Sequence, residues 1–250
     1  MNDLELLIKL HITQYRQGPG GKEETLLAAR LAGLSSEQPF NIADIGCGTG
    51  ASTIELVTHF DCSIQAVDFL PEFIETLKCR AVQAQVGDKI TPIVGNMEDL
   101  PFEEEFFDVL WSEGAIYNMG FEKGISEWRK YLKPGGKLVV SELTWLTEER
   151  PEEITRHWAS EYPEVAPAAV KITQLEKHGY KLLGYFPLGI HCWLENYYQP
   201  LQARFVSFMA EHLDRPEAAK ALVEEHLAEI DLYEKYKDFV SYGFYIAEKV

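Results

Sequence analysis

The segment Asn41–Ala51, NIADIGCGTGA, constrains the fold of this chain more than any other. A short apolar run ends in Asp44, glycines follow at the alternate positions 46, 48 and 50, and a helical pattern begins directly after them. A strand that turns through a glycine loop into a helix N-terminus is the usual layout of a nucleotide-type cofactor site. The sequence therefore predicts an α/β domain whose cofactor site lies on this loop.

Two kinds of cofactor fit this loop by pattern alone. Gly46-x-Gly48-x-x-Ala51 satisfies the loose dinucleotide fingerprint, and Asp68 ends the next strand-like run, where a ribose-binding acid is expected. Asp44 argues against a dinucleotide, because a carboxylate where the strand meets the loop repels a pyrophosphate but attracts an ammonium or a sulfonium centre. A cationic cofactor without phosphate is favoured, and an NAD-linked oxidoreductase is the alternative.

Four further segments follow the glycine loop within about residues 40 to 143, and they lie at 67–69, 95–102, 106–113 and 131–140. With Asp44–Gly50 as the first motif, their order resembles the class I S-adenosylmethionine-dependent methyltransferases: the acidic end of the second strand, the adenine-contacting loop, the fourth strand and the turn into the fifth. The resemblance implies S-adenosyl-L-methionine as the cofactor and methyl transfer as the activity. One departure is Asn96, where the family often has Asp; its amide oxygen still accepts a hydrogen bond from the adenine amine.

The resemblance also implies where the cofactor is bound. Asp68 is expected to accept hydrogen bonds from both ribose hydroxyls, since a carboxylate has two oxygens for two donors. Gly46 and Gly48 allow close approach of the methionine part. The remaining expected contacts line the adenine or the loop, and they are Cys47, Phe69, Asn96 and Met97.

An N-terminal segment, Tyr15–Gly21, is similar to an Arg-Gln-Gly-Pro-Gly segment found before the first strand in a subset of small-molecule methyltransferases. By that resemblance Tyr15, Gln17 and Gly18 fold over the cofactor. A glycine-rich hinge suits a lid that excludes water. A plain turn between two helices is the alternative.

Several polar and aromatic residues are candidates for the acceptor side of the site. Glu113 ends the fourth strand, and it either faces the methionyl end, serves as a general base, holds a cationic acceptor or is a structural acid. His191 is the histidine we favour as a second candidate base. Residues expected to bind the acceptor are Tyr117 and Asn118 on the loop after Glu113 and the later aromatics Trp145, Trp193 and Tyr197.

Apolar periodicity predicts alternating strands and helices over the first 143 residues. We expect strands near 41–45, 63–67, 90–94, 106–111 and 137–142 and helices near 50–59, 71–85 and 121–132. Beyond them we expect helices over 151–160, 166–178 and 193–237 and strands near 181–186 and 242–247. This alternation predicts a doubly wound, Rossmann-like α/β fold. The family resemblance implies seven strands, mostly parallel, with the last strand antiparallel.

We interpret residues 1–250 as a single methyltransferase domain. Its parts are a helical lid at 1–34, a cofactor-binding core at 35–143 and an acceptor-side half at 144–250, with a helical insertion at about 190–240 before the last strand. The apolar stripe of the first helix either forms a homodimer contact or packs on the lid.

The amino-acid composition limits which binding partners are expected. The net charge of −17 argues against binding to nucleic acid or to an anionic membrane, and a small-molecule acceptor is favoured. The four cysteines show no C-x-x-C spacing, so we expect reduced thiols and no metal site. The N-terminus has no signal-peptide pattern, and we expect a cytoplasmic protein. A methyltransferase-like protein that binds the cofactor without turnover is a further alternative.

Overall fold

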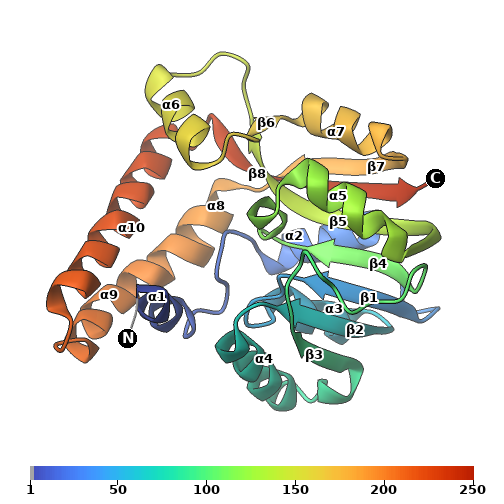
Figure 1. Ribbon diagram of the computed structural model, residues 1–250, viewed down its shortest axis with the longest axis horizontal. Helices are drawn as coiled ribbons and strands as arrows, with labels where there is room; N and C mark the ends of the chain where they lie inside the picture. Colours follow the sequence, from blue (N-terminus) through green and yellow to red (C-terminus); the bar gives the residue numbers. More distant parts are fainter. Residues whose placement is uncertain (1–2) are drawn as a thin grey trace.

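A computed structural model describes residues 3–250, and Figure 1 shows a single twisted sheet with helices on both faces and a helical cap at one end. The strands run in the order β3-β2-β1-β4-β5-β8-β7, and β6 pairs with β5 off this path. All neighbours are parallel except β8, which is antiparallel to both β5 and β7. The strands are β1 (Phe40–Ile45), β2 (Cys62–Asp68), β3 (Ile90–Val94), β4 (Phe107–Ser112), β5 (Leu132–Trp145), β6 (Ala166–Pro167), β7 (Tyr180–Pro187) and β8 (Val240–Lys249).

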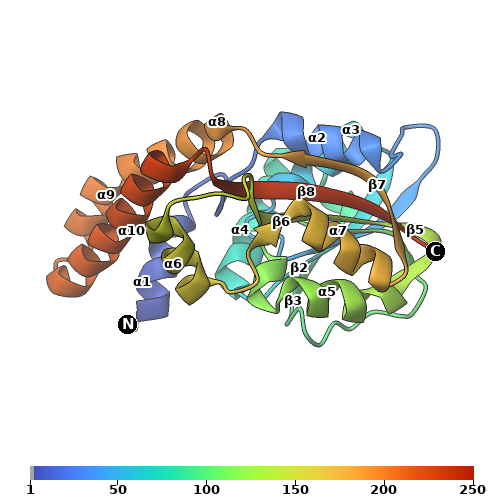
Figure 2. The ribbon, with the colours of Figure 1, turned by 90° about the horizontal axis from the view of Figure 1, so that it is seen from above.

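The helices form two layers against the sheet. Helices α2 (Lys22–Leu31), α3 (Ala51–His59) and α4 (Pro71–Gln83) share one buried apolar cluster with one face of the sheet. Helices α5 (Phe121–Trp128) and α7 (Ala168–Lys177) share a second cluster with the other face, as Figure 2 shows from above. Side chains alternate between the faces of a strand, so both faces of the central strands are apolar and buried.

The cap lies beyond the carboxyl ends of the parallel strands. It consists of α1 (Asp3–His11), α6 (Glu152–Glu161), α8 (Ile190–Trp193), the π-helical turn η4 (Leu194–Tyr198), α9 (Gln199–Glu211) and α10 (Pro216–Tyr236). Helix α1 packs against α9 and α10, although more than 180 residues separate it from them in sequence. Short 3₁₀ turns complete the chain at η1 (Gly87–Lys89), η2 (Ile116–Asn118) and η3 (Arg129–Tyr131).

The predicted fold class is confirmed, and most element bounds agree within a few residues. Three details differ. The helix expected at 166–178 begins at Ala168, because Ala166–Pro167 instead pair with β5 as the short strand β6. Strand β5 begins at Leu132 rather than 137, since Leu132 pairs with Phe107 across an irregular register. The helical insertion opens at Ile190 and passes through a π-helical turn. Such turns are rare in proteins overall, but those that occur are often found at functional sites.

The loop after β1 requires glycine. Gly46, Gly48 and Gly50 have φ angles of 75°, 56° and 90°, a region that costs other residues roughly 1–2 kcal/mol each. A Cβ atom on Gly46 would also collide with the Ala115 side chain. Both constraints explain why the alternating glycines are a strong fold signal.

None of the helices within residues 3–250 combines the length and the apolar character that crossing a bilayer requires.

Candidate functional site

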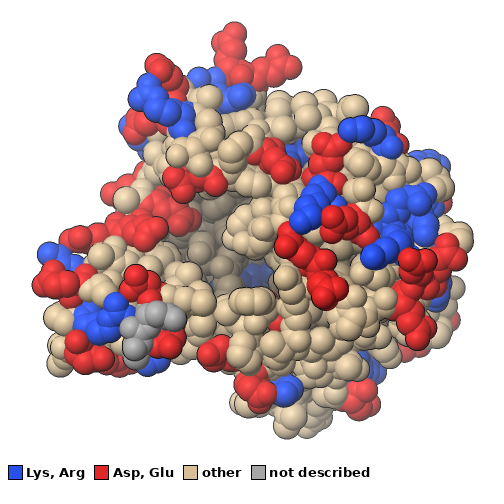
Figure 3. Space-filling view, viewed as in Figure 1, with Lys and Arg blue, Asp and Glu red and all other residues tan. Residues whose placement is uncertain are grey.

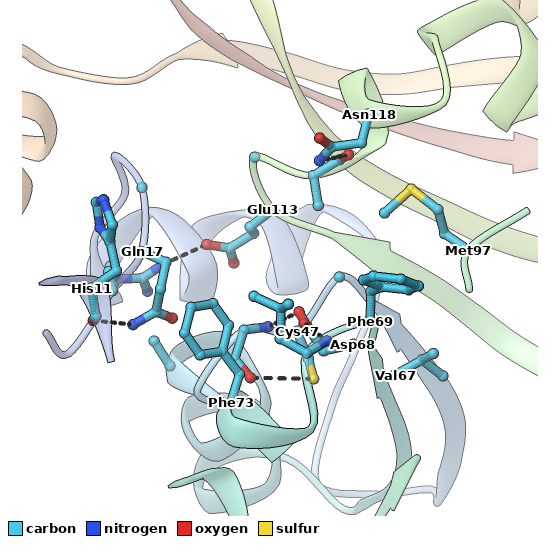
Figure 4. A pocket seen from close by; sticks show the side chains of 18 of the residues that line it. His11, Gln17, Cys47, Val67, Asp68, Phe69, Phe73, Met97, Glu113 and Asn118 are labelled. Carbon is cyan, nitrogen blue, oxygen red and sulfur yellow. Dashed lines mark hydrogen bonds and ion pairs between the residues drawn. The ribbon is translucent and has the colours of Figure 1, made fainter. Parts of the chain in front are cut away.

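A cavity of about 630 Å³ opens where β1, β2 and β4 end and where α1 lies over them. Figure 3 shows the hollow between the cap and the sheet, and Figure 4 shows the side chains within it. A volume of this size suits a small-molecule site. Many of the predicted site residues line it, namely Gln17, Gly18, Gly46, Cys47, Gly48, Asp68, Phe69, Asn96, Met97, Glu113, Tyr117, Asn118 and Tyr197.

The backbone amides of the glycine loop already have partners within the protein. The amides of residues 46 and 47 both donate to Val67 O. Those of residues 48, 49 and 50 donate to Asp68 Oδ2, Gln17 Oε1 and Cys47 O, and all five distances are 2.8–3.0 Å. A pyrophosphate is bound by free amides of this kind. Among the described residues that line the cavity, Arg16 is the one with a guanidinium or ammonium group, and it is paired with Glu113. The loop is therefore poorly suited to a dinucleotide.

Asp44 does not line the cavity, which corrects the expected direct contact with a cationic cofactor. Its side chain is fully buried, and Oδ2 accepts hydrogen bonds from Ser52 Oγ at 2.9 Å and Thr53 Oγ1 at 2.6 Å. Burial raises the pKa of the Asp44 carboxyl to about 7, against the lowering effect of the two hydroxyls. Asp44 thus ties β1 to the first turn of α3, and Ser52 is the residue of this group that reaches the cavity.

Asp68 ends β2 and faces the cavity beside the loop. Its Oδ2 accepts from the Gly48 amide at 2.8 Å and its Oδ1 from the Leu70 amide at 3.0 Å. Each carboxylate oxygen keeps a lone pair for a further donor. Burial raises the pKa of Asp68, while the backbone amides oppose this. Two acceptors at this position suit the two hydroxyls of a ribose.

One side of the cavity is lined by Phe69, Asn96 and Met97, the residues expected to contact adenine. Figure 4 places Phe69 and Met97 across the same space, and the Phe69 side chain is 67% exposed. Asn96 Oδ1 accepts from the Glu98 amide at 3.0 Å and keeps a lone pair. Exposed apolar groups beside an amide acceptor fit an aromatic base with an exocyclic amine. With the free acceptors of Asp68, these residues fit an S-adenosyl group.

Glu113 ties the lid segment to the end of β4. Its Oε2 accepts from Arg16 NH1 at 2.7 Å, and its Oε1 accepts from Thr25 Oγ1 at 2.8 Å and Trp111 Nε1 at 3.0 Å. The side chains of Arg16 and Glu113 are each only 8% exposed. Both carboxylate oxygens are engaged by a buried guanidinium and two further donors, so the geometry favours a structural link over a general base at Glu113.

Gln17 makes a second link between the lid segment and the glycine loop. Its Oε1 accepts from the Thr49 amide at 2.9 Å, and its Nε2 donates to the Gln14 carbonyl at 3.1 Å. Sequence reasoning named Gln17 but missed Arg16, its neighbour. Its partner, Glu113, is 97 residues away in the sequence, so no local pattern indicated this ion pair.

The end of the cavity away from the glycine loop is formed by three distant elements. Tyr117 and Asn118 come from η2 and Tyr197 from η4. Helix α1 adds four lining residues that we did not predict, namely Leu4, Leu7, Ile8 and His11. Leu4, Leu7 and Ile8 belong to the apolar stripe of the first helix, but the sequence does not show what that stripe faces. In the structure these three residues border the cavity.

Besides Asp44, four predicted residues lie outside the cavity. Tyr15 is 51% exposed and donates to Glu55 Oε1 at 3.1 Å. Trp145 is buried beneath the Arg150 guanidinium, at 4.3 Å from the ring centroid. Trp193 stacks between Tyr233 and Tyr242 in the core of the cap, with ring centroids 4.3 and 5.3 Å away. Their apolar surface is used in packing, so these tryptophans do not wall the acceptor pocket.

His191, the fourth, is also misplaced as a candidate base. Its Nε2 lies 3.1 Å from Glu24 Oε1 and 3.5 Å from Cys192 Sγ, and its side chain is 49% exposed. Cysteine spacing predicts no metal site, yet the fold brings these three potential ligand atoms within 4.8 Å of one another. Hydrogen bonds among the three account for the arrangement.

A family model described as a methyltransferase domain matches residues 43–140. Malonyl-[acyl-carrier protein] O-methyltransferase of Herminiimonas arsenicoxydans is 35% identical over 47% of this chain and 43% of the relative. 27-O-demethylrifamycin SV methyltransferase of Amycolatopsis mediterranei is 26% identical over 62% of this chain and 57% of the relative. The chain thus spans about half the length of these curated relatives.

The solved structures agree on the fold. A SAM-dependent methyltransferase from Geobacter sulfurreducens, in complex with S-adenosyl-L-homocysteine, has a TM-score of 0.84 at 16% identity and covers 98% of both chains. The comparisons support the predicted cofactor, S-adenosylmethionine. Residues 43–140 therefore match a methyltransferase domain, and the chain has the fold of a solved S-adenosylmethionine-dependent methyltransferase.

Proposed function

We propose that this protein transfers the methyl group of S-adenosylmethionine to a small-molecule acceptor. The observation that carries the proposal is the single cavity, which joins the Asp68 end to the chamber bordered by Tyr117, Tyr197 and α1. A methyl donor whose ribose lies at Asp68 and whose methionine part follows the glycine loop brings its sulfur near Glu113 and Gly114. The chamber is then left for the acceptor. Nothing in this arrangement names the acceptor.

We assign the cofactor contacts to residues that line the cavity. Asp68 binds the ribose hydroxyls, Asn96 binds the adenine amine, and Phe69 and Met97 pack on the adenine ring. The methionine part lies along Gly46–Gly48. When bound, S-adenosylmethionine supplies an electrophilic methyl group, so the protein has mainly to orient and desolvate the reactants. Orientation contributes up to roughly 7–11 kcal/mol in such reactions.

We further propose that residues 12–21 act as the lid over the cofactor. The links from Arg16 to Glu113 and from Gln17 to Thr49 support this, because they hold the segment against both edges of the cavity. Pro19 and Gly18 border the cavity between these links. A lid fixed at two points excludes water while its glycines allow it to open.

Calorimetry with S-adenosylhomocysteine tests the assignment. Asp68→Ala removes two charge-assisted contacts to the ribose, so we expect the affinity to fall by about 100-fold or more. Asp61→Ala is the matched control, because Asp61 is exposed at the opposite end of the same strand. Equal affinities of both variants and the wild-type protein would overturn the site.

Ligand binding and turnover distinguish the proposed methyltransferase from the two alternative functions. Thermal shift assays with S-adenosylhomocysteine and with NAD distinguish the methyltransferase from an NAD-linked oxidoreductase, and we expect stabilisation by S-adenosylhomocysteine alone. A protein that binds the cofactor without catalysis would show the same shift but would form no S-adenosylhomocysteine from S-adenosylmethionine with any acceptor.

A further inference from the structure

Two buried histidines meet at the acceptor end of the cavity. His11 is the last residue of α1, and His226 lies in α10. Their Nε2 atoms are 3.1 Å apart, and the side chains are 7% and 8% exposed. Only His11 of the two borders the cavity, where its ring also stacks with Tyr197 at 6.3 Å between centroids.

The hydrogen bonds of this pair fix its tautomers. His226 Nδ1 lies 2.8 Å from the Leu222 carbonyl oxygen, which only accepts, so Nδ1 of His226 carries a hydrogen. In neutral His226, Nε2 is therefore an acceptor. His11 Nε2 must then donate to it, which leaves Nδ1 of neutral His11 as a bare lone pair. Burial, together with neighbouring His226, lowers the pKa of His11 to about 4, so His11 is neutral at pH 7.

This lone pair has no partner in the protein. Nδ1 of His11 is buried and makes no hydrogen bond. A buried acceptor left unsatisfied costs roughly 1–3 kcal/mol, so such an atom calls for a ligand or another explanation. Leu4, Leu7 and Ile8 on the same helix are apolar and supply no donor. Figure 4 shows the His11 side chain at the edge of the cavity, above Gln17.

We propose that Nδ1 of His11 accepts the hydrogen bond, and then the proton, of a hydroxyl group on the methyl acceptor. The inference rests on the proposed methyltransferase function and assigns that function an O–H acceptor. A single acceptor lone pair matches the single donor of a hydroxyl. The proposal includes a slight shift of α1 as the acceptor enters, because Nδ1 is shielded from water in this structure. His226 is a positioning residue, because it holds His11 in the required tautomer without touching the acceptor.

The chemical step balances with one proton transfer. A lone pair of the hydroxyl oxygen forms the new C–O bond as the C–S bond breaks and its electron pair returns to sulfur. The O–H proton passes to His11 Nδ1 and later to water. A weak base is sufficient, because the O–H becomes strongly acidic as the oxygen is methylated.

The first test requires no acceptor. In full-length protein labelled with ¹⁵N-histidine and saturated with S-adenosylhomocysteine, two-bond ¹H–¹⁵N correlation spectra report the tautomer of each ring. The spectrum of His226→Gln assigns that residue's own signals. We expect His11 protonated at Nε2 and bare at Nδ1 at pH 7. A hydrogen on Nδ1 of His11 overturns the proposal.

The second test uses methyl-labelled S-adenosylmethionine with a panel of phenol, catechol, benzyl alcohol, benzylamine and thiophenol. His11→Gln keeps a donor at the Nε2 position but removes the base. For any product formed, we expect kcat to fall by about 100-fold or more, with KM for the acceptor changed much less. His212→Gln is the matched control, since His212 is a buried cap histidine outside the cavity, bonded to the Phe208 carbonyl.

The outcomes are distinct. Methylation of hydroxyl members that His11→Gln loses and His212→Gln retains supports the proposal. Methylation only at nitrogen or sulfur, or full turnover by His11→Gln, overturns it. If no member of the panel reacts, the tautomer of His11 in the NMR spectrum decides whether the proposal stands. Failure of the wild-type protein to bind S-adenosylhomocysteine would instead contradict the proposed function.

Discussion

The two ends of the cavity are built in different ways. At the cofactor end, strands β1 and β2 deliver the glycine loop and Asp68 from one continuous stretch of chain, and backbone hydrogen bonds set its shape. At the acceptor end, α1, η2 and η4 meet from three distant parts of the sequence, and side chains set the shape. The first end therefore depends on local chain geometry, while the second depends on how distant elements pack.

The largest expected effect concerns a buried ion pair between β5 and α7. Glu142 and Lys171 form an ion pair of 3.0 Å, with side chains 0% and 1% exposed. Burial raises the pKa of Glu142 to about 7, so its carboxyl is ionised at about pH 8. Lys171→Met then leaves a buried carboxylate without its counter-charge, and we expect a loss of about 3–5 kcal/mol in the free energy of unfolding. Urea denaturation at this pH measures the loss.

The partly exposed pair between Lys137 and Glu248 supplies the matched control for Lys171. Solvent screens a partly exposed pair, so Lys137→Met should be far milder. A loss in Lys171→Met no larger than in Lys137→Met would show that water reaches the Glu142 site.

The second effect belongs to the cofactor end. Gly46 and Gly135 have φ angles of 75° and 73°, but only at Gly46 would a Cβ meet a neighbour. Alanine at either site should cost about 1–2 kcal/mol from backbone strain. Gly46→Ala adds roughly 1–3 kcal/mol from the collision with Ala115.

Calorimetry separates this strain from binding. Gly46→Ala should also weaken S-adenosylhomocysteine binding by at least about tenfold, because the loop moves, whereas Gly135→Ala should not. Comparable losses of stability and affinity in both variants would mean that backbone strain alone, not close packing, accounts for the glycine.

The third effect concerns Asp44, the buried acid of the cofactor end. Its native pKa of about 7 exceeds the unfolded value of 3.8, so between these pH values the native state binds more protons and wild-type stability falls as the pH rises. Asp44→Asn lacks this ionisation. Relative to the wild type, it should gain up to about 1.4 kcal/mol per pH unit from pH 4 to 7, then level off.

Urea denaturation across this pH range measures the difference between the two proteins. Glu142, whose pKa burial also raises to about 7, contributes equally to both and cancels. A difference that stays flat with pH would show that the Asp44 carboxyl titrates normally, and hence that Ser52 and Thr53 compensate its burial.

The same contrast explains what could be predicted from the sequence. Strand and helix positions follow from local periodicity, and the glycines and Asp68 stand in short motifs, so the fold and the gathering of these residues at one cavity were predictable. Arg16 and His11 were not, because each acts through a partner some 100 to 200 residues away, Glu113 or His226. Asp44 was placed near the loop correctly but given the wrong contact, since a motif does not show which way a side chain turns.

The smallest expected effect separates the two candidate histidines. His191 is 49% exposed, and its contact with Glu24 is an exposed ion pair of the kind that contributes about 0–1 kcal/mol. We expect His191→Gln to leave both S-adenosylhomocysteine affinity and methyl transfer unchanged within about twofold, measured beside His11→Gln. A histidine beside aromatic residues in sequence invited a catalytic interpretation, but chemistry at a cavity requires a ring that borders it, and only His11 does so. A large loss of turnover in His191→Gln, with folding intact, would mean that the lid swings this residue inward and that the acceptor end extends further along the cap.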